Sequence, residues 1–367
     1  MTGLLPPATT PAPDVDPRHE IRLDALHAVR GRNYWSRCPV IRMDLAVGAY
    51  DHVSSADVPG VTDALMRAMP GLIEHECSIG VRGGFRTRLR RGTYAPHIIE
   101  HVALELQAMI GHDAGFGRTR GGDADGEYTV AFEYIHEHVG LRAATLALDV
   151  VQRAFAGSLE SVDAAVRELQ AIAATPDAPP LVRRVLCGVT GGSGRGDATR
   201  TLRHWLASQG RGEDVVVDVA PEALLREGLP YARSQLGIVL DAELTDVPPR
   251  YRDPERARRL VSVVADGVRR DGFVICPASE WELQDYAREL DRRVAIFATD
   301  DDVTVRDERV AAAVARVRGR RILIERGGAP HDAGALDPTR PVAAQVAAAL
   351  AAFVIAGNDD TARWVDA

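Results

Sequence analysis

Apolar and polar residues alternate along three stretches in the first half of the chain. Residues 21–29 and 40–48 follow this alternation loosely and predict two strands. Residues 128–135, YTVAFEYI, predict a third strand, because aromatic and β-branched side chains dominate it.

Apolar residues recur at helical spacing in the segments between and after these strands. Residues 58–70, 96–110 and 140–156 predict three helices. Residues 111–126 contain six glycines and are expected to form a loop. Strands and helices in this arrangement predict an α+β domain over residues 19–174.

The pattern changes in the second half of the chain. After a predicted helix over residues 161–174, the Pro-containing stretch 175–180 indicates a linker. A strand over residues 181–189 then leads through a Gly-rich turn into a helix over residues 199–208, which is typical of a phosphate-binding loop. Residues 181–367 are therefore expected to form an α/β domain with a parallel sheet.

Composition limits the location and the partners of the protein. The 367 residues carry a net charge of -8, which argues against nucleic acid as a partner. No stretch approaches the roughly 18 apolar residues of a membrane span. Residues 1–18 are rich in Pro and Thr and are expected to form a disordered leader. The four scattered cysteines form no C-x-x-C pair and favour a reducing cytoplasm.

The predicted helix over residues 96–110 contains the motif H-x-x-E-H. His97 and His101 stand four residues apart, so both imidazoles leave the same helix face and can hold one metal ion. Glu100 stands in the place of the glutamate that activates water in inverted zincin motifs. The alternative is an amphipathic helix whose histidines make ordinary hydrogen bonds. On the first interpretation the cofactor is Zn²⁺ or another divalent metal.

Two histidines leave a catalytic zinc ion one protein ligand short. We expect Glu133 to complete the set, because a carboxylate in a central strand is costly to bury unless it binds a cation or is paired. Glu133 on a solvated face of that strand is the alternative. Other side chains with suitable chemistry are Glu105, Glu74, His75 and His112.

Every basic residue of the chain is an arginine, because the sequence contains no lysine. Lysine chemistry, including Schiff bases and the phosphate-binding lysine of nucleotide loops, is therefore excluded. A cluster of arginines precedes the H-x-x-E-H motif and is expected to meet substrate carboxylates, although a solvated charged face is the alternative. Its members are Arg86, Arg88, Arg90 and Arg91.

Several segments of the first half resemble the amino-terminal domain of cyanophycin synthetases over about residues 22–160. They are RGRNYW, PGLIEHECSIGVRGGF, GTYAPHIIEHVALELQAMIGHDAGFGRTR and YTVAFEYIHEHVGLRAA. The resemblance implies binding of a polymer of aspartate and arginine. Some members of that family also have a metal-dependent hydrolytic activity. The resemblance implies that His97, Glu100 and His101 would be part of that hydrolytic site.

The second half is similar to the Mur-ligase-like domain that ends cyanophycin synthetases. The large ATP-grasp domain that separates the two parts in that family is absent between them here. The loop Thr190–Asp197 also departs from the family's T-G-T-N-G-K-T-T: Gly191 and Gly194 remain, whereas Arg195 replaces the lysine and no hydroxyl follows to hold Mg²⁺. ATP is therefore not an expected cofactor.

A second part of that ligase site also departs from the family pattern. The Glu-Asp-His stretch that serves Mg²⁺ in the family falls on residues 241–246, where no histidine occurs. We expect residues 181–367 to be inactive as a ligase and to serve as a scaffold, as a surface through which the chain forms a homo-oligomer, or as a recognition module.

These observations favour a metal-dependent hydrolase that cuts a peptide or isopeptide bond in cyanophycin or a related amide of Asp and Arg. The metal would polarise the carbonyl and lower the pKa of bound water, while Glu100 would carry the proton to the leaving amine. The alternatives are a binding or regulatory protein without chemistry and an ATP-dependent amide ligase with an altered nucleotide loop.

Overall fold

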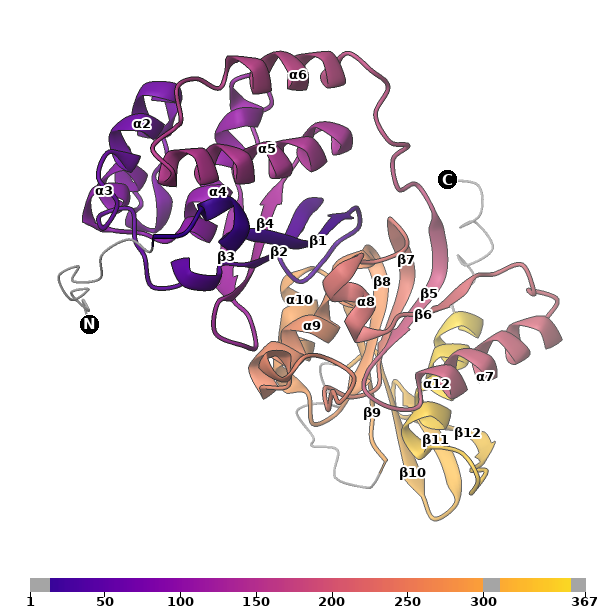
Figure 1. The fold of residues 1–367 in the computed structure, drawn as a ribbon. Coiled ribbons are helices and arrows are strands. Elements are labelled where there is room, and N and C mark those ends of the chain that lie inside the picture. Colours follow the sequence, from indigo (N-terminus) through magenta and orange to yellow (C-terminus); the bar gives the residue numbers. More distant parts are fainter. Residues whose placement is uncertain (1–13, 300–310, 358–367) are drawn as a thin grey trace. The chain divides into compact units, whose positions relative to one another are not determined.

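The computed structural model describes residues 14–299 and 311–357, which divide into two compact units (Figure 1). Unit 1 comprises the described chain up to Arg30 together with Cys38–Pro180, and unit 2 comprises the remaining described residues. No helix in these ranges is long and apolar enough to cross a membrane.

One short segment of unit 2 comes from an unexpected place in the sequence. Gly31–Arg37 lies between the first two strands of unit 1 along the chain but belongs to unit 2. Its Trp35 is buried there, and the indole Nε1 donates to the carbonyl oxygen of Leu225 at 3.4 Å. A loop between two strands of one unit therefore contributes to the core of the other.

Unit 1 is built on a four-stranded antiparallel sheet in the order β1-β2-β4-β3. The predicted strands are confirmed as β1 (Arg22–Val29), β2 (Val40–Ala46) and β4 (Glu127–Glu133). The prediction of a loop over residues 111–126 is wrong in part, because β3 (Gly117–Gly121) pairs along β4. Backbone hydrogen bonds to a neighbouring strand outweigh the low strand propensity of its glycines.

The four helices predicted in this half are confirmed as α2 (Val61–Ala68), α4 (Ala95–Ala108), α5 (Glu137–Phe155) and α6 (Asp163–Ala173). Two further helices, α1 (Pro17–Glu20) and α3 (Gly84–Arg91), were not predicted. α4 and α5 pack against each other and against the sheet. α1 begins inside the stretch predicted as a disordered leader, and residues 1–13 of that stretch lie outside the described residues.

Helix α4 is the central element of unit 1. Pro96 occupies its first turn, where the missing N–H costs no hydrogen bond, and Gly111 with φ 85° follows its C-terminus. Only His97 and Ala108 of its 14 residues are not buried. Tertiary packing therefore covers α4 on nearly every side, and the burial alone does not separate a metal site from histidines that make ordinary hydrogen bonds.

Unit 2 contains an eight-stranded sheet in the order β12-β11-β10-β9-β8-β7-β5-β6, parallel from β6 to β10 and antiparallel beyond it. The strands are β5 (Arg184–Thr190), β6 (Val216–Asp218), β7 (Arg233–Val239), β8 (Val268–Pro277), β9 (Arg293–Phe297), β10 (Ala313–Arg318), β11 (Arg321–Arg326) and β12 (Ala329–Ala335). This topology confirms the predicted α/β class.

Two groups of helices cover the two faces of this sheet (Figure 1). Helices α7 (Arg195–Ser208) and α12 (Val342–Ala356) pack side by side and share one apolar core with strands β5 to β11. Helices α9 (Pro254–Gly267) and α10 (Trp281–Glu289) cover the opposite face. Because β5 connects to β6 on one side and pairs with β7 on the other, the strand order reverses at β5.

Candidate metal centre

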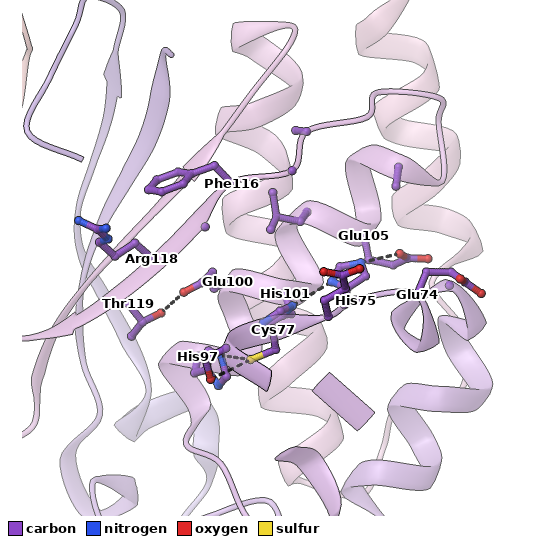
Figure 2. Close-up of a pocket in the computed structure, with 18 of the residues that line it drawn as sticks. Glu74, His75, Cys77, His97, Glu100, His101, Glu105, Phe116, Arg118 and Thr119 are labelled. Atoms are coloured by element: carbon purple, nitrogen blue, oxygen red, sulfur yellow. Dashed lines mark hydrogen bonds and ion pairs between the residues drawn. The ribbon is translucent and has the colours of Figure 1, made fainter. Parts of the chain in front are cut away.

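A cavity of about 1150 Å³ opens in unit 1 beside helix α4 (Figure 2). Residues 74–78, which follow a short 3-10 helix, form one wall, and residues 113–120, which lead into β3, form another. The motif residues His97, Glu100 and His101 of α4 line the cavity between these walls.

Three potential metal ligands meet in this cavity. The ligand atoms of Cys77, His97 and His101 all lie within 4.8 Å of one another. The Sγ atom of Cys77 and the Nε2 atom of His97 are 3.3 Å apart. A tetrahedral zinc ion with bonds of ~2.3 Å to sulfur and ~2.0 Å to nitrogen would separate two such atoms by about 3.6 Å. The separation of Cys77 and His97 is thus close to that of two ligands of one ion.

The chemistry of this donor set fits zinc. A thiolate and two imidazoles are ligands that Zn²⁺ prefers, whereas Mg²⁺ and Ca²⁺ prefer oxygen. Structural zinc sites are closed by four protein ligands, whereas catalytic sites carry three and keep one position open. Among the described residues, the cluster gathers three such side chains.

A chain of hydrogen bonds behind His101 orients its imidazole (Figure 2). The Nε2 atom of His75 lies 3.1 Å from Oε2 of Glu105, and its Nδ1 atom lies 2.8 Å from Nδ1 of His101. In the tautomer in which His101 donates through Nδ1, the lone pair of its Nε2 is left for a cation.

His97 is held in the equivalent way from its own side. Its Nδ1 atom lies 2.7 Å from Oγ1 of Thr93, so Nε2 faces Cys77. The Phe85 ring stacks on the imidazole of His101 at 3.9 Å and meets that of His97 edge-on at 5.8 Å. Packing and hydrogen bonding together hold both imidazoles in place before any ion binds.

Burial keeps both imidazoles neutral. Desolvation lowers the pKa of His97 to about 4, with a further contribution from Arg88, and lowers that of His101 to about 2, with contributions from His97 and His75. A neutral imidazole is the form that binds metal. The pair therefore needs no deprotonation at neutral pH to act as ligands.

Glu100 lies between the cluster and strand β3. Its side chain is 6% exposed, and Oε2 accepts a hydrogen bond of 2.5 Å from Oγ1 of Thr119 (Figure 2). Burial raises the pKa of the Glu100 carboxyl to about 7, against the opposing effects of Thr119, Arg120 and Arg118. Gly117 makes room for this carboxylate, because a Cβ there would lie 2.6 Å from Oε1.

Charged side chains of both signs surround the cluster. The positive group that lines the cavity is Arg88, Arg118 and Arg120, and the negative group, besides Glu100 and Glu105, is Glu74, Glu76 and Asp113. Oε1 of Glu74 also pairs with Arg82 at 2.5 Å. The cavity can therefore meet a ligand that carries both a carboxylate and a cationic group.

The structure brings together some predicted site residues and separates others. His97, Glu100 and His101 share the cavity, but Glu133 is neither in the ligand cluster nor among the residues that line the cavity. Glu133 ends β4, where its backbone N–H donates to the carbonyl oxygen of Phe116, and the third member of the cluster is Cys77. The cluster thus makes Cys77 a candidate third ligand in place of the expected Glu133.

The remaining candidates take different positions. His75 and Glu105 support His101 through hydrogen bonds, whereas the ring of His112 stacks with that of His136 at 6.3 Å. Of the four arginines predicted to meet substrate, only Arg88 lines the cavity. The others are Arg86, Arg90 and Arg91. Successive residues of a helix point in directions about 100° apart, so one short helix cannot aim four neighbouring arginines at one cavity.

The residues that the sequence prediction missed come from other segments. Cys77 was counted among scattered cysteines, and Thr93 and Thr119 carry no motif. The spacing H-x-C at His75 and Cys77, about 20 residues before the H-x-x-E-H motif, was the one available signal. In unit 2, Gly191 and Gly194 of the degenerate loop lie between β5 and α7, and Arg195 is the first residue of α7.

Comparison with known proteins identifies the family of this region. Residues 40–156 match the model of the cyanophycin synthase-like N-terminal domain. The chain is 48% identical over 122 residues to the cyanophycin synthetase of Synechocystis sp., a match that covers 33% of this chain and 14% of the relative. Identity to the Geminocystis herdmanii enzyme is 44% over the same length and shares. Unit 1 thus contains a domain of this type.

The similarity of this chain to solved structures is weaker. A crystal structure of MurF from Acinetobacter baumannii gives a TM-score of 0.33 at 11% identity, over 65% of this chain and 50% of that one. The structure of UDP-N-acetylmuramoylalanyl-D-glutamyl-2,6-diaminopimelate--D-alanyl-D-alanyl ligase from Acinetobacter baumannii gives a TM-score of 0.32 at 12% identity over the same shares. At such scores the α/β class of unit 2 rests on its own strand order.

If the cluster holds a metal, removal of any of its three side chains should release it. We expect Cys77→Ala, His97→Ala and His101→Ala each to lower zinc affinity more than about 100-fold, because loss of a residue that only orients a ligand already costs ~10–100-fold. Glu105→Gln should fall in that smaller range. The measurement is the number of zinc ions per chain, determined by mass spectrometry after dialysis against increasing concentrations of a chelator.

Glu133→Ala serves as the control and should bind zinc as the unchanged protein does. Full retention of zinc by the double variant His97→Ala/His101→Ala would disprove the site.

Proposed function

We propose that unit 1 is a zinc-dependent hydrolase that cleaves a peptide or isopeptide bond. The observation that carries this proposal is the open three-ligand cluster of Cys77, His97 and His101 beside the buried carboxylate of Glu100. Three ligands and an adjacent proton acceptor are the parts that metal-assisted amide hydrolysis requires.

Glu100 is the residue that moves the proton. When bound, the cation would act as a Lewis acid toward the amide carbonyl and the attacking water. Glu100 accepts a proton from that water as the new C–O bond forms, and it donates this proton to the leaving nitrogen as the C–N bond breaks. Thr119 holds the carboxylate toward the cavity through a hydrogen bond of 2.5 Å.

The charges of the cavity support a substrate with both acidic and cationic groups. Arg88, Arg118 and Arg120 would bind carboxylates, and the acidic residues opposite them would bind a guanidinium. Cyanophycin, the polymer for which the relatives are named, combines aspartate with arginine. We therefore propose cyanophycin or a related amide of Asp and Arg as the substrate.

A second candidate function follows from one specific observation. Cys77, His97 and Thr93 form a line with contacts of 3.3 Å and 2.7 Å, which has the order of a nucleophile, a base and an orienting residue. Cys77 also has a φ of 55°, which is uncommon for a residue with a side chain. In this mechanism Sγ attacks the amide carbon, and His97 passes the thiol proton to the leaving amine. Water then hydrolyses the thioester.

Activity itself is the first test of the main proposal. The purified protein with one equivalent of zinc should release Asp-Arg dipeptides from cyanophycin or cleave the isopeptide bond of such dipeptides. Loss of proton transfer should cost ~10²–10⁴-fold in kcat, so Glu100→Gln should lose at least that much while it keeps its zinc. Liquid chromatography of the products checks both.

Failure to bind zinc would contradict the metal site itself. Zinc binding without cleavage of either compound would favour a binding protein, the alternative given in the sequence analysis.

Substitution of Cys77 by histidine separates the metal mechanism from the thiol mechanism. The introduced imidazole would still offer a nitrogen ligand, so Cys77→His should keep zinc and a measurable part of the activity if the metal acts. A thiol mechanism predicts complete loss in this variant and no effect of a chelator on the unchanged protein. The measurement is the activity of both proteins without dipicolinate, with dipicolinate, and after zinc is added back.

A methyl group at residue 117 should displace the catalytic carboxylate without removing the metal. Gly117→Ala places Cβ against Oε1 of Glu100, so we expect kcat to fall by ~10-fold or more, since small misplacements are costly in catalysis. Gly121→Ala on the same strand meets no atom within 4 Å and should leave kcat unchanged. Equal activity of the two variants would contradict the assigned position of Glu100.

A further inference from the structure

The glycine loop between β5 and α7 of unit 2 has the form of an anion-binding loop. It follows the strand at which the strand order reverses, and ligands of open α/β sheets bind outside the carboxyl ends of strands at such a point. Helix α7 begins directly after Gly194, which has a φ of 72°. Free backbone N–H groups of such a loop would attract a phosphate.

These N–H groups already have an anionic partner within the chain. Asp241, which follows the end of β7, accepts hydrogen bonds from the backbone N–H of Gly192 at 2.6 Å and from that of Ser193 at 3.2 Å. The hydroxyl of Ser193 donates to the same carboxylate at 3.2 Å, and the N–H of Glu243 donates at 3.1 Å. Four donors therefore surround one carboxylate.

The backbone of the loop also packs closely on the segment that contains Asp241. A Cβ at Gly192 would lie 2.0 Å from the carbonyl oxygen of Glu243 and 2.8 Å from Oδ1 of Asp241. Gly191 has a φ of 136°, and a Cβ added to it would lie 3.0 Å from the Cβ of Leu240. Only glycine fits at these two positions, so the loop and the Asp241 segment form one packed unit.

Arg195 has contacts that agree with this closed loop. It stands where a phosphate-binding lysine would be expected, yet its Nη1 donates to the carbonyl oxygen of Gly191 at 2.7 Å. Its Nε pairs with Asp218 at the end of β6 at 3.0 Å. The only cationic side chain of the loop thus braces the backbone and does not point to a ligand.

We propose that Asp241 is a built-in anion that takes the place of a phosphate in this loop. Unit 2 then folds around its own carboxylate and is closed to nucleotides and other phosphates. A phosphate could enter only by breaking four hydrogen bonds and by lying against the displaced negative charge of Asp241. This inference concerns unit 2 alone and is independent of the hydrolase proposed for unit 1.

Chemical rescue of an Asp241 variant tests the proposal on the full chain. No tryptophan occurs in the residues of unit 1, so tryptophan fluorescence follows the unfolding of unit 2. Asp241→Ala removes the acceptor of four hydrogen bonds and should lower the melting temperature by on the order of 5 °C. Inorganic phosphate at about 20 mM should restore most of this loss by binding the vacated loop.

The exposed Asp246→Asn is the matched control, because it removes one charge from the same segment. Phosphate stabilises many proteins non-specifically. The increase in melting temperature from chloride to phosphate at equal ionic strength is therefore compared between the two variants. Only the part of the increase in Asp241→Ala that exceeds the increase in Asp246→Asn supports binding in the loop. The unchanged protein should show no excess rise with phosphate or with Mg·ATP.

Three outcomes would overturn the proposal. They are an unchanged melting temperature in Asp241→Ala, a loss that phosphate does not restore beyond the control, and stabilisation of the unchanged protein by Mg·ATP. Should Asp241→Ala fail to fold, Asp241→Asn gives the same comparison, because its Oδ1 can still accept from Gly192 while its amide opposes Ser193. A smaller loss and a smaller rescue are then expected.

Discussion

Unit 1 depends on the cost of burying ionisable side chains in helix α4. The helix is covered on nearly every side, yet Glu100, His101 and Glu105 are each only 6% exposed. A buried polar group without a partner costs several times more than the net gain of an ordinary hydrogen bond. Each of the three is partnered from a distant segment: Glu100 by Thr119, and His101 and Glu105 by His75.

This constraint explains two glycines that no turn requires. Gly71 and Gly117 lie against the carboxylates of Glu105 and Glu100, and a Cβ at either position would come within 2.6 Å of an oxygen. The backbone on both sides of the cavity therefore approaches the acids of α4 closely. The network that stabilises the buried helix is also the network that aims its imidazoles at Cys77.

The two units treat a buried or half-buried carboxylate in opposite ways. In unit 1 the acids lie beside a cavity of about 1150 Å³ with charged walls, where they can act on a ligand. In unit 2 the carboxylate of Asp241 accepts hydrogen bonds from the N–H groups of the glycine loop. Carboxylates thus face an open cavity in one unit, whereas in the other a carboxylate is hydrogen-bonded to a glycine loop.

Local pattern determined most of the elements and one face of the site. The periodicity of residues 96–110 predicted α4, and the spacing of His97 and His101 put both imidazoles on one face, because these features depend only on residues within a few turns. Only the tertiary structure decided that Cys77 and not Glu133 joins them, that β3 pairs with β4, and that Asp241 fills the loop after β5. Each of these depends on contact between separate segments of the chain, and the periodicity of one segment carries no information about which other segment packs against it.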